Sequence, residues 1–146
     1  MSKPARPSFE TTLLVRDNCM CMHVQRAARA LARRFDEALK PVGLTNQQFS
    51  LLMSLNRPEP PRMKEVALLL ALDRTTLTAN LKPLERRGLA IARPDPHDKR
   101  SRRLAITDEG RSLLARAVPL WRRTEDEIEK PLADPDGLRA DLRKLS

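Results

Sequence analysis

Residues typical of catalytic sites are scarce in this chain of 146 residues. It contains two histidines, His23 and His97, no tyrosine, and four glycines that form no phosphate-binding loop. A catalytic site needs several polar side chains that converge on one point, and the sequence offers no such set. We therefore expect a protein that is not an enzyme and that uses no cofactor.

Long apolar segments are also missing. The longest uninterrupted apolar run, residues 66–72, has seven residues, whereas a helix that spans a membrane needs about 20. The first 17 residues lack the apolar core and the cleavage site of a signal peptide. These two absences predict a cytoplasmic protein with no membrane partner.

Positive charge, in contrast, is abundant. Lysine and arginine number 28 against 19 acidic residues, which gives a net charge of +9 and predicts a polyanionic partner. Over residues 73–103, nine basic residues face four acidic ones. A basic patch that binds membranes would carry exposed aromatic or leucine side chains, and the polar segment 94–102 has none. DNA is the better match for this charge.

The spacing of apolar residues predicts a mainly helical protein. Apolar residues recur at intervals of three and four over residues 20–39, which is typical of one long helix. Thr45 and Gln48 have the spacing of a capping box at the start of the next helix. Further helices are expected over about 63–71, after the capping residues Asp73 and Thr107, and around residues 138–145.

Two short segments, residues 89–93 and 103–106, alternate between apolar and polar residues like strands. The segment between them is polar and rich in turn-forming residues, so we expect a hairpin whose tip projects into solvent as a wing. The predicted fold class is therefore mainly α with a small β-hairpin wing, a winged helix-turn-helix. The expected organisation is a loose N-terminal arm (1–15), then a single domain (16–146) made of dimerisation helices (16–40 and 107–146) and a winged helix-turn-helix DNA-binding lobe (45–106).

The polar face of the helix after Asp73 is the first candidate for binding DNA. Small residues at Ala67 and Ala71, with Leu77 between the helices, suit a tight helix crossing, which makes the second helix a recognition helix. Hydroxyl, amide and cationic side chains on its exposed face can contact phosphates and base edges: Arg74, Thr75, Thr76, Thr78, Asn80 and Lys82. An ordinary amphipathic helix pair is the alternative, and the charge of the neighbouring wing favours DNA.

These residues resemble a known family. The similarity to the MarR (multiple antibiotic resistance regulator) family extends over roughly residues 18–130 and is carried by the following runs: Asp73-Arg74-Thr75-Thr76-Leu77-Thr78, Leu84-Glu85-Arg86-Arg87-Gly88-Leu89, Arg93, Asp95-Pro96-His97-Asp98-Lys99-Arg100 and Leu104-Ala105-Ile106-Thr107-Asp108-Glu109-Gly110. The resemblance implies a homodimer whose first, fifth and sixth helices interlock. It also implies a sequence-specific regulator of transcription, a repressor, that binds a palindromic double-stranded operator and is released by a small-molecule or oxidant signal.

The resemblance also assigns roles in the wing. It implies that Arg100 enters the minor groove beside Lys99, and that Asp98 orients Arg100 by an ion pair. A narrow minor groove concentrates negative potential, so an inserted guanidinium is physically favoured there. The alternative is a winged-helix protein-interaction module that does not read DNA. Such a module would not bind a duplex with a steep dependence on salt.

The two cysteines are candidate redox sensors. Cys21 lies on the apolar stripe of the long helix, where a small buried side chain is the first interpretation. Cys19 shares the opposite face with His23 and Arg26, at a helix N-terminus that would favour the thiolate. Cys21 matches the reactive position of the hydroperoxide-sensing branch of the family, although this chain lacks the tyrosines of that branch. Because Cys19, Cys21 and His23 do not converge on one face, we expect no metal site.

A ligand crevice is a further implication of the resemblance. Small aromatic effectors of the family bind between the dimerisation helices and the DNA-binding lobe. The side chains that could line such a crevice here are Met20, His23, Phe49, Met53 and Trp121. Each of them could equally be part of the hydrophobic core.

Overall fold

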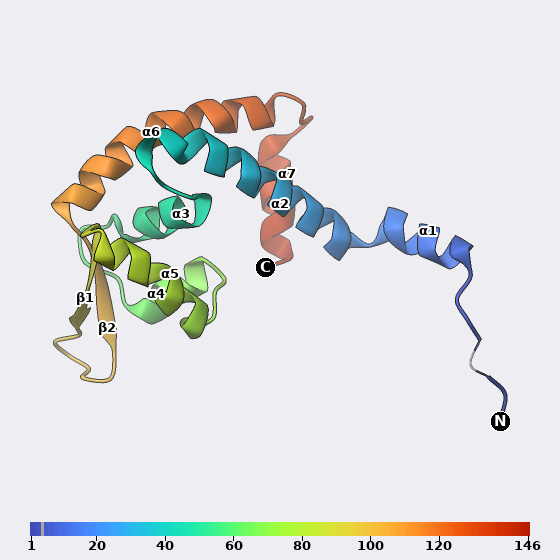
Figure 1. The fold of residues 1–146 in the computed structure, drawn as a ribbon, viewed down its shortest axis with the longest axis horizontal. Coiled ribbons are helices and arrows are strands. Elements are labelled where there is room, and N and C mark those ends of the chain that lie inside the picture. Colours follow the sequence, from blue (N-terminus) through green and yellow to red (C-terminus); the bar gives the residue numbers. More distant parts are fainter. Residues whose placement is uncertain (4) are drawn as a thin grey trace. The chain divides into compact units, whose positions relative to one another are not determined.

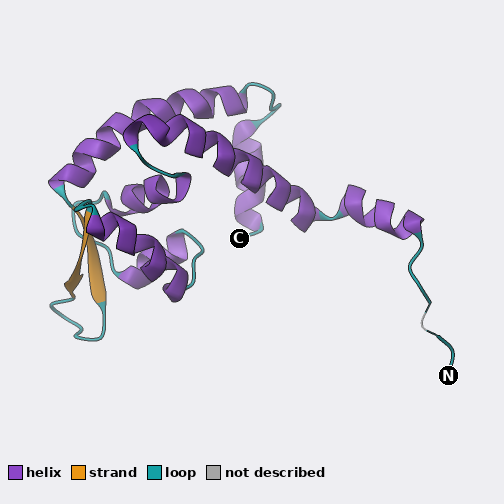
Figure 2. Cartoon of the chain, viewed as in Figure 1, coloured by secondary structure: helices purple, strands orange, loops and turns teal. Residues whose placement is uncertain are grey.

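A computed structural model describes residues 1–3 and 5–146 (Figure 1). These residues fall into two compact units, 1–34 and 35–146. The sequence predicted an arm followed by one domain from residue 16, and Pro4 of that arm lies outside the described residues. The elements in chain order are α1 (Phe9–Asn18), α2 (Met20–Leu39), a 3₁₀ turn (Lys40–Val42), α3 (Asn46–Leu55), α4 (Met63–Leu69), α5 (Arg74–Arg86), β1 (Ala90–Pro94), β2 (Arg102–Ile106), α6 (Asp108–Glu129) and α7 (Pro135–Lys144) (Figure 2).

The predicted loose arm is wrong for residues 9–15, because they belong to helix α1. Ser8 caps this helix, and its Oγ accepts a hydrogen bond of 3.2 Å from the backbone N–H of Thr11. No proline follows until Pro41, so none removes a backbone donor from α1 or α2; the two helices are separated at Cys19, whose backbone is extended. No residue of α1 is buried, and Leu39 is the only buried residue of α2.

The capping box predicted at the start of α3 is confirmed. The side chain of Thr45 accepts from the N–H of Gln48 at 3.2 Å, and the Gln48 side chain accepts from the N–H of Thr45 at 3.0 Å. α3 packs against α4, α5, α6 and β2, which places it at the centre of the core. Fully buried leucines from these helices and from β2 form that core, among them Leu52, Leu77 and Leu104, each 0% exposed.

The turn between α4 and α5 differs from the prediction. α4 ends at Leu69, two residues before the expected end, and Ala71 adopts a left-handed backbone with φ of 52°. The N–H of Leu72 donates to the carbonyl of Ala67 at 2.9 Å, which closes the helix end in the manner usually completed by glycine. Ala71 is therefore a turn residue and not part of α4, whereas Leu77 of α5 is fully buried in the core.

The predicted hairpin is confirmed. β1 and β2 pair in antiparallel fashion with Ala92 opposite Leu104, and the polar loop between them forms the tip of the wing. Thr107 caps α6 and its side chain accepts from the N–H of Gly110 at 3.0 Å, as its position after the hairpin predicts. The fold is thus mainly α with a two-stranded wing (Figure 2). Among the described residues, no helix has the length and apolar character needed to cross a bilayer.

Candidate nucleic-acid interface

α5 separates an apolar face from a polar face, as the sequence predicts. Leu77, Leu81 and Leu84 are buried on one side. The predicted contact residues lie on this same helix: Arg74, Thr75, Thr76, Thr78 and Lys82 are exposed, and Asn80 is half-buried. The helix therefore presents cations, hydroxyls and one amide to solvent while its leucines hold it in the core.

Two of the threonine hydroxyls already donate within the helix. Thr76 Oγ1 donates to Asp73 Oδ2 at 3.0 Å, and Thr78 Oγ1 donates to the carbonyl of Arg74 at 2.8 Å. The backbone N–H of Thr76 also donates to Asp73 at 2.7 Å, and this bond, together with that from the Thr76 hydroxyl, lowers the pKa of Asp73. Thr76 thus completes the cap of α5, which leaves Asn80 as the cleaner probe of base contacts.

The wing tip places Arg100 in solvent, and the predicted role of Asp98 needs correction. Oδ1 of Asp98 accepts from the backbone N–H of Arg100 at 3.0 Å, and the contact is to this amide instead of to the guanidinium. An aspartate two residues earlier in a turn reaches this amide readily, because its short side chain mimics a turn of the backbone. The N–H of Ser101 donates to the carbonyl of Asp98 at 3.0 Å and closes the turn. Lys99 and Arg100 are both exposed.

A concave surface joins the recognition helix to the wing. A cavity of about 400 Å³ is lined by residues of α4, α5 and the hairpin: Met63, Lys64, Ala67, Arg74, Asp98, Arg100, Ser101 and Arg102. Four of these side chains are cations and one is a carboxylate. Arg74 of α5 and Arg100 of the wing tip therefore face the same hollow. Sequence reasoning missed Lys64 and Arg102, whose positive charge was the available signal.

Asp95, at the end of β1, was also missed as a functional residue. Its side chain is completely buried, and Oδ2 lies 3.2 Å from Nε of Arg62 and 3.5 Å from Nε of Arg103. The N–H of His97 donates to Oδ1 at 2.9 Å and is the main cause of the lowered pKa of Asp95. Burial opposes this effect, and the charges of Arg103 and Arg62 add to it. A buried acid inside a basic wing is unusual enough to be informative.

The cysteines lie where α1 meets α2, within the unit 1–34. Cys21 is exposed in the single chain, so the interpretation as a buried packing residue is wrong there, and its Sγ accepts from Nε2 of Gln25 at 3.3 Å. Cys19 is half-buried, and its carbonyl oxygen lies 2.8 Å from Nδ1 of His23. Among the described residues, no group of three His, Cys, Asp or Glu side chains is placed to hold a metal ion.

A mostly apolar cavity of about 550 Å³ lies between α3, α6 and the end of α4. Three of the five predicted pocket residues line it, Phe49, Met53 and Trp121, and the rings of Phe49 and Trp121 stack with centroids 6.4 Å apart. The rest of the lining comes from Ser50, Ser54, Leu69, Leu70, Val118 and Arg122. Met20 and His23, the other two predicted residues, belong to the unit 1–34 and are exposed.

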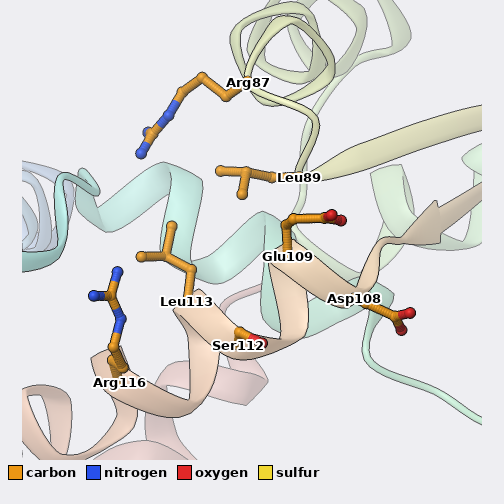
Figure 3. A pocket seen from close by; sticks show the side chains of 7 residues that line it. All are labelled: Arg87, Leu89, Asp108, Glu109, Ser112, Leu113 and Arg116. Atoms are coloured by element: carbon orange, nitrogen blue, oxygen red, sulfur yellow. The ribbon is translucent and has the colours of Figure 1, made fainter.

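A third hollow, of about 500 Å³, lies between the end of α5 and the first half of α6 (Figure 3). Arg87 and Arg116 flank it, and Leu89 and Leu113 face one another between them (Figure 3). Arg87 also donates from Nη1 to the carbonyl of Gly43 at 2.8 Å, so its charge is partly engaged in holding the turn before α3. None of the predicted DNA-contact residues lines this hollow.

Comparison with known proteins places this geometry in a family. A family model for MarR proteins matches residues 42–101. The transcriptional regulator MosR of M. tuberculosis, solved in complex with DNA, is 39% identical, with a TM-score of 0.81 over 88% of this chain and 93% of MosR. The transcriptional repressor CouR, solved with a 23-mer DNA duplex, is 34% identical, with a TM-score of 0.75 over 90% of this chain and 92% of CouR. The organic hydroperoxide resistance transcriptional regulator of Bacillus subtilis is 28% identical over 71% of each chain. The chain belongs to the MarR family of transcription regulators.

Proposed function

We propose that the protein is a sequence-specific regulator of transcription that acts as a homodimeric repressor on a palindromic double-stranded operator. The observation that carries the proposal is the cationic hollow that joins Arg74 of α5 to Arg100 of the wing. α5 has the polar face that a major groove admits, and Arg100 is exposed at the wing tip, where its guanidinium suits the negative potential of a narrow minor groove. Such a protein works where the chromosome is, in the cytoplasm, and does no chemistry on its ligands.

The structures of the relatives support this proposal. MosR and CouR were each solved with DNA, and CouR is a repressor. The rival reading, a winged-helix module that binds proteins only, gives no reason for a cation to stand at both edges of the same hollow. It also predicts no steep dependence of duplex binding on salt.

The test is a titration of a labelled duplex, selected from a random pool, at several salt concentrations. Arg100→Ala should weaken binding by about 1 to 3 kcal/mol and flatten the salt slope by about one unit, because one cation leaves the interface. Asn80→Ala should weaken the selected duplex more than a random one, because the amide reaches base edges. Arg116→Ala, on the hollow of Figure 3, is the matched control and should change neither. If Arg100→Ala and Asn80→Ala both leave affinity unchanged, the protein does not read DNA in this way.

We propose further that a small aromatic effector enters the apolar cavity beside Trp121. CouR was solved with p-coumaroyl-CoA, so one relative binds a coenzyme A thioester that carries an aromatic group. Leu69 and Leu70, at the end of α4, line the cavity, so an occupant would push on the first helix of the helix-turn-helix. Trp121 is the single tryptophan of the chain, and its fluorescence should change on binding. Met53→Arg should abolish both the fluorescence change and the release of DNA.

Oxidant sensing by the cysteines is the second proposed route of release. Cys19 is half-buried and Cys21 is exposed in the single chain, so peroxide can reach at least Cys21. Organic hydroperoxide should then release the duplex, and a serine at the responsible cysteine should prevent the release. Mass spectrometry can confirm that both thiols are completely oxidised. If the oxidised protein still binds the duplex as before, the cysteines have a packing role only.

A further inference from the structure

We propose that Asp95 positions the wing for DNA: its buried carboxylate fixes the base of the hairpin to the segment before α4 and so determines where Arg100 stands. The inference rests on the DNA-binding function proposed above. It adds a positioning residue that does not itself touch DNA, because its side chain is completely buried.

The two oxygens of the carboxylate are held differently: Oδ1 accepts a hydrogen bond from the N–H of His97, and Oδ2 is held by charge. Oδ2 lies within 3.5 Å of Nε of both Arg62 and Arg103, yet it has no hydrogen-bond donor of good geometry among the described residues. Burying an acid in this way costs desolvation free energy, so the ion pairs of Asp95 are not expected to add much to the stability of the fold. A role in fixing the position of the hairpin explains the buried carboxylate better. The two arginines would repel each other without it.

The contact joins the wing to the helix-turn-helix. Arg62 directly precedes α4 and is paired with Arg103 of β2 as an isolated antiparallel bridge. Nη1 of Arg103 donates to the carbonyl of Pro60 at 2.9 Å, and the N–H of Leu104 donates to the carbonyl of Pro61 at 2.9 Å. Asp95 therefore lies at the point where the hairpin is fastened to the entrance of α4.

The same residue shapes the tip. Oδ1 of Asp95 accepts from the N–H of His97, and the N–H of Asp95 donates to the carbonyl of Ser101 at 3.1 Å. These bonds close the loop 96–100, which carries Arg100. A substitution of Asp95 should consequently displace Arg100 in two ways: it loosens the attachment of the hairpin to the segment before α4, and it changes the conformation of the loop 96–100.

Asp95→Asn is the informative substitution, because charge alone and positioning predict opposite results. The amide keeps the size of the side chain and an acceptor for His97 but removes the negative charge. On charge alone, loss of an acid from a cationic DNA-binding surface strengthens binding. If Asp95 positions the wing, Asp95→Asn weakens binding to the selected duplex about tenfold. Glu85→Gln, an exposed acid at the end of α5, is the matched control and should bind at least as tightly as the wild type.

A double-mutant cycle shows whether Asp95 acts through Arg100. In that case the double variant Asp95→Asn/Arg100→Ala binds no more weakly than Arg100→Ala alone, since the positioned group is already gone. Asp95→Glu, which keeps the charge, should recover part of the lost affinity. Losses that add, or an Asp95→Asn variant that binds as tightly as the wild type, would overturn the proposal.

Two further outcomes are distinguishable. If circular dichroism shows Asp95→Asn to be unfolded, the same cycle is run with Arg62→Gln, and here too a non-additive loss supports positioning while an additive loss overturns it. If the wild type fails to bind any selected duplex, or if Arg100→Ala has no effect, the proposed function itself is wrong and the role of Asp95 is overturned with it.

Discussion

Two regions of the molecule bury apolar surface to different extents: the winged-helix lobe (45–106) and the helices α1, α2 and α7. In the lobe, α3, α4 and α5 bury apolar side chains against one another, α3 and α4 also pack against β2, and α5 packs against β1. α1 and α7 bury no residue, and α2 buries only Leu39. Leu31 of α2 is 37% exposed and Leu142 of α7 is 41% exposed, whereas Leu77 of the lobe is 0% exposed.

This contrast indicates that the core of the lobe, to which α6 adds Leu113 and Leu114, is complete in one chain, whereas the apolar faces of α1, α2 and α7 are left uncovered. Monomeric soluble proteins rarely leave continuous apolar faces open to water. A second copy of the chain, related by a two-fold axis, would cover the same face on both subunits. The difference between the two regions therefore separates the contacts that fold the lobe from those expected to hold the dimer.

The largest expected effect concerns the core of the lobe. Leu77→Ala should destabilise the protein by about 2 to 5 kcal/mol, because Leu77 is fully buried in the core and the substitution leaves a cavity there. Leu68→Ala, on the exposed side of α4, should change stability by no more than about 0.5 kcal/mol. Urea denaturation followed by circular dichroism measures the free energy of unfolding of both variants. Equal losses of stability would show that the fold of the lobe does not depend on the burial of Leu77.

A smaller effect is expected for the outer helices. Leu142→Glu should weaken dimerisation about a hundredfold, since it places a charge in an apolar face that a partner covers. The lobe should keep its fold, while duplex binding should fall with the loss of the second half-site contact. Ser146→Glu, which adds the same charge at the end of the chain, is the control for sedimentation measurements. A Leu142→Glu protein that stays dimeric would place the interface elsewhere.

Local signals in the sequence predicted the elements well, because their causes are local. The capping box of Thr45 and Gln48, the cap of α5 at Asp73 and the hairpin all depend on residues a few positions apart. α1 was not predicted: two prolines in the first seven residues are typical of a loose arm, whereas Ser8 caps a helix that begins at Phe9. The polar recognition face of α5 was predictable for the same reason, because the buried leucines and the exposed polar residues lie on the same helix.

Contacts between distant residues were not predictable. Asp95 is held by Arg62, and Arg103 bonds to Pro60, in each case across more than 30 residues of chain. Neither charge nor periodicity states which arginine a given acid will meet. Asp98 is a different case, because its contact with the N–H of Arg100 is local; the sequence does not state whether the carboxylate meets that amide or the guanidinium.

Acid should destabilise the unit 35–146, which holds the lobe and the end of α2, more than the unit 1–34. The pKa values of Asp36, Asp73 and Asp95 are all lowered by hydrogen bonds to the folded backbone, and all three lie in the unit 35–146. A carboxyl whose folded pKa is depressed stabilises the fold above its unfolded pKa of about 3.9, and this contribution disappears as the pH falls through the folded pKa.

The measurement is urea unfolding between pH 7 and pH 2. Stability should decline as the pH falls below about 5 and keep declining below 4. Asp36→Asn should flatten part of this decline, because Asp36 accepts two bonds from Asn46 at 2.7 and 2.8 Å. Asp126→Asn, on an exposed stretch of α6, is the control. If the free energy of unfolding falls equally with pH in Asp36→Asn and in the wild type, Asp36 does not contribute to the loss of stability in acid.

The smallest expected effects on stability concern turn residues with a left-handed backbone. Among the described residues, positive φ angles occur only at Gly43, Ala71 and Gly88, all in the unit 35–146. Gly88 ends α5 with φ of 71°, and an added Cβ would meet nothing within 4 Å, so Gly88→Ala should cost about 1 kcal/mol from the backbone alone. Ala71→Gly relieves the same strain but adds freedom to the unfolded chain, so the gain should be about 0.5 kcal/mol or less. Urea midpoints at constant m-value measure both. A Gly88→Ala protein as stable as the wild type would show that this turn can relax to another backbone.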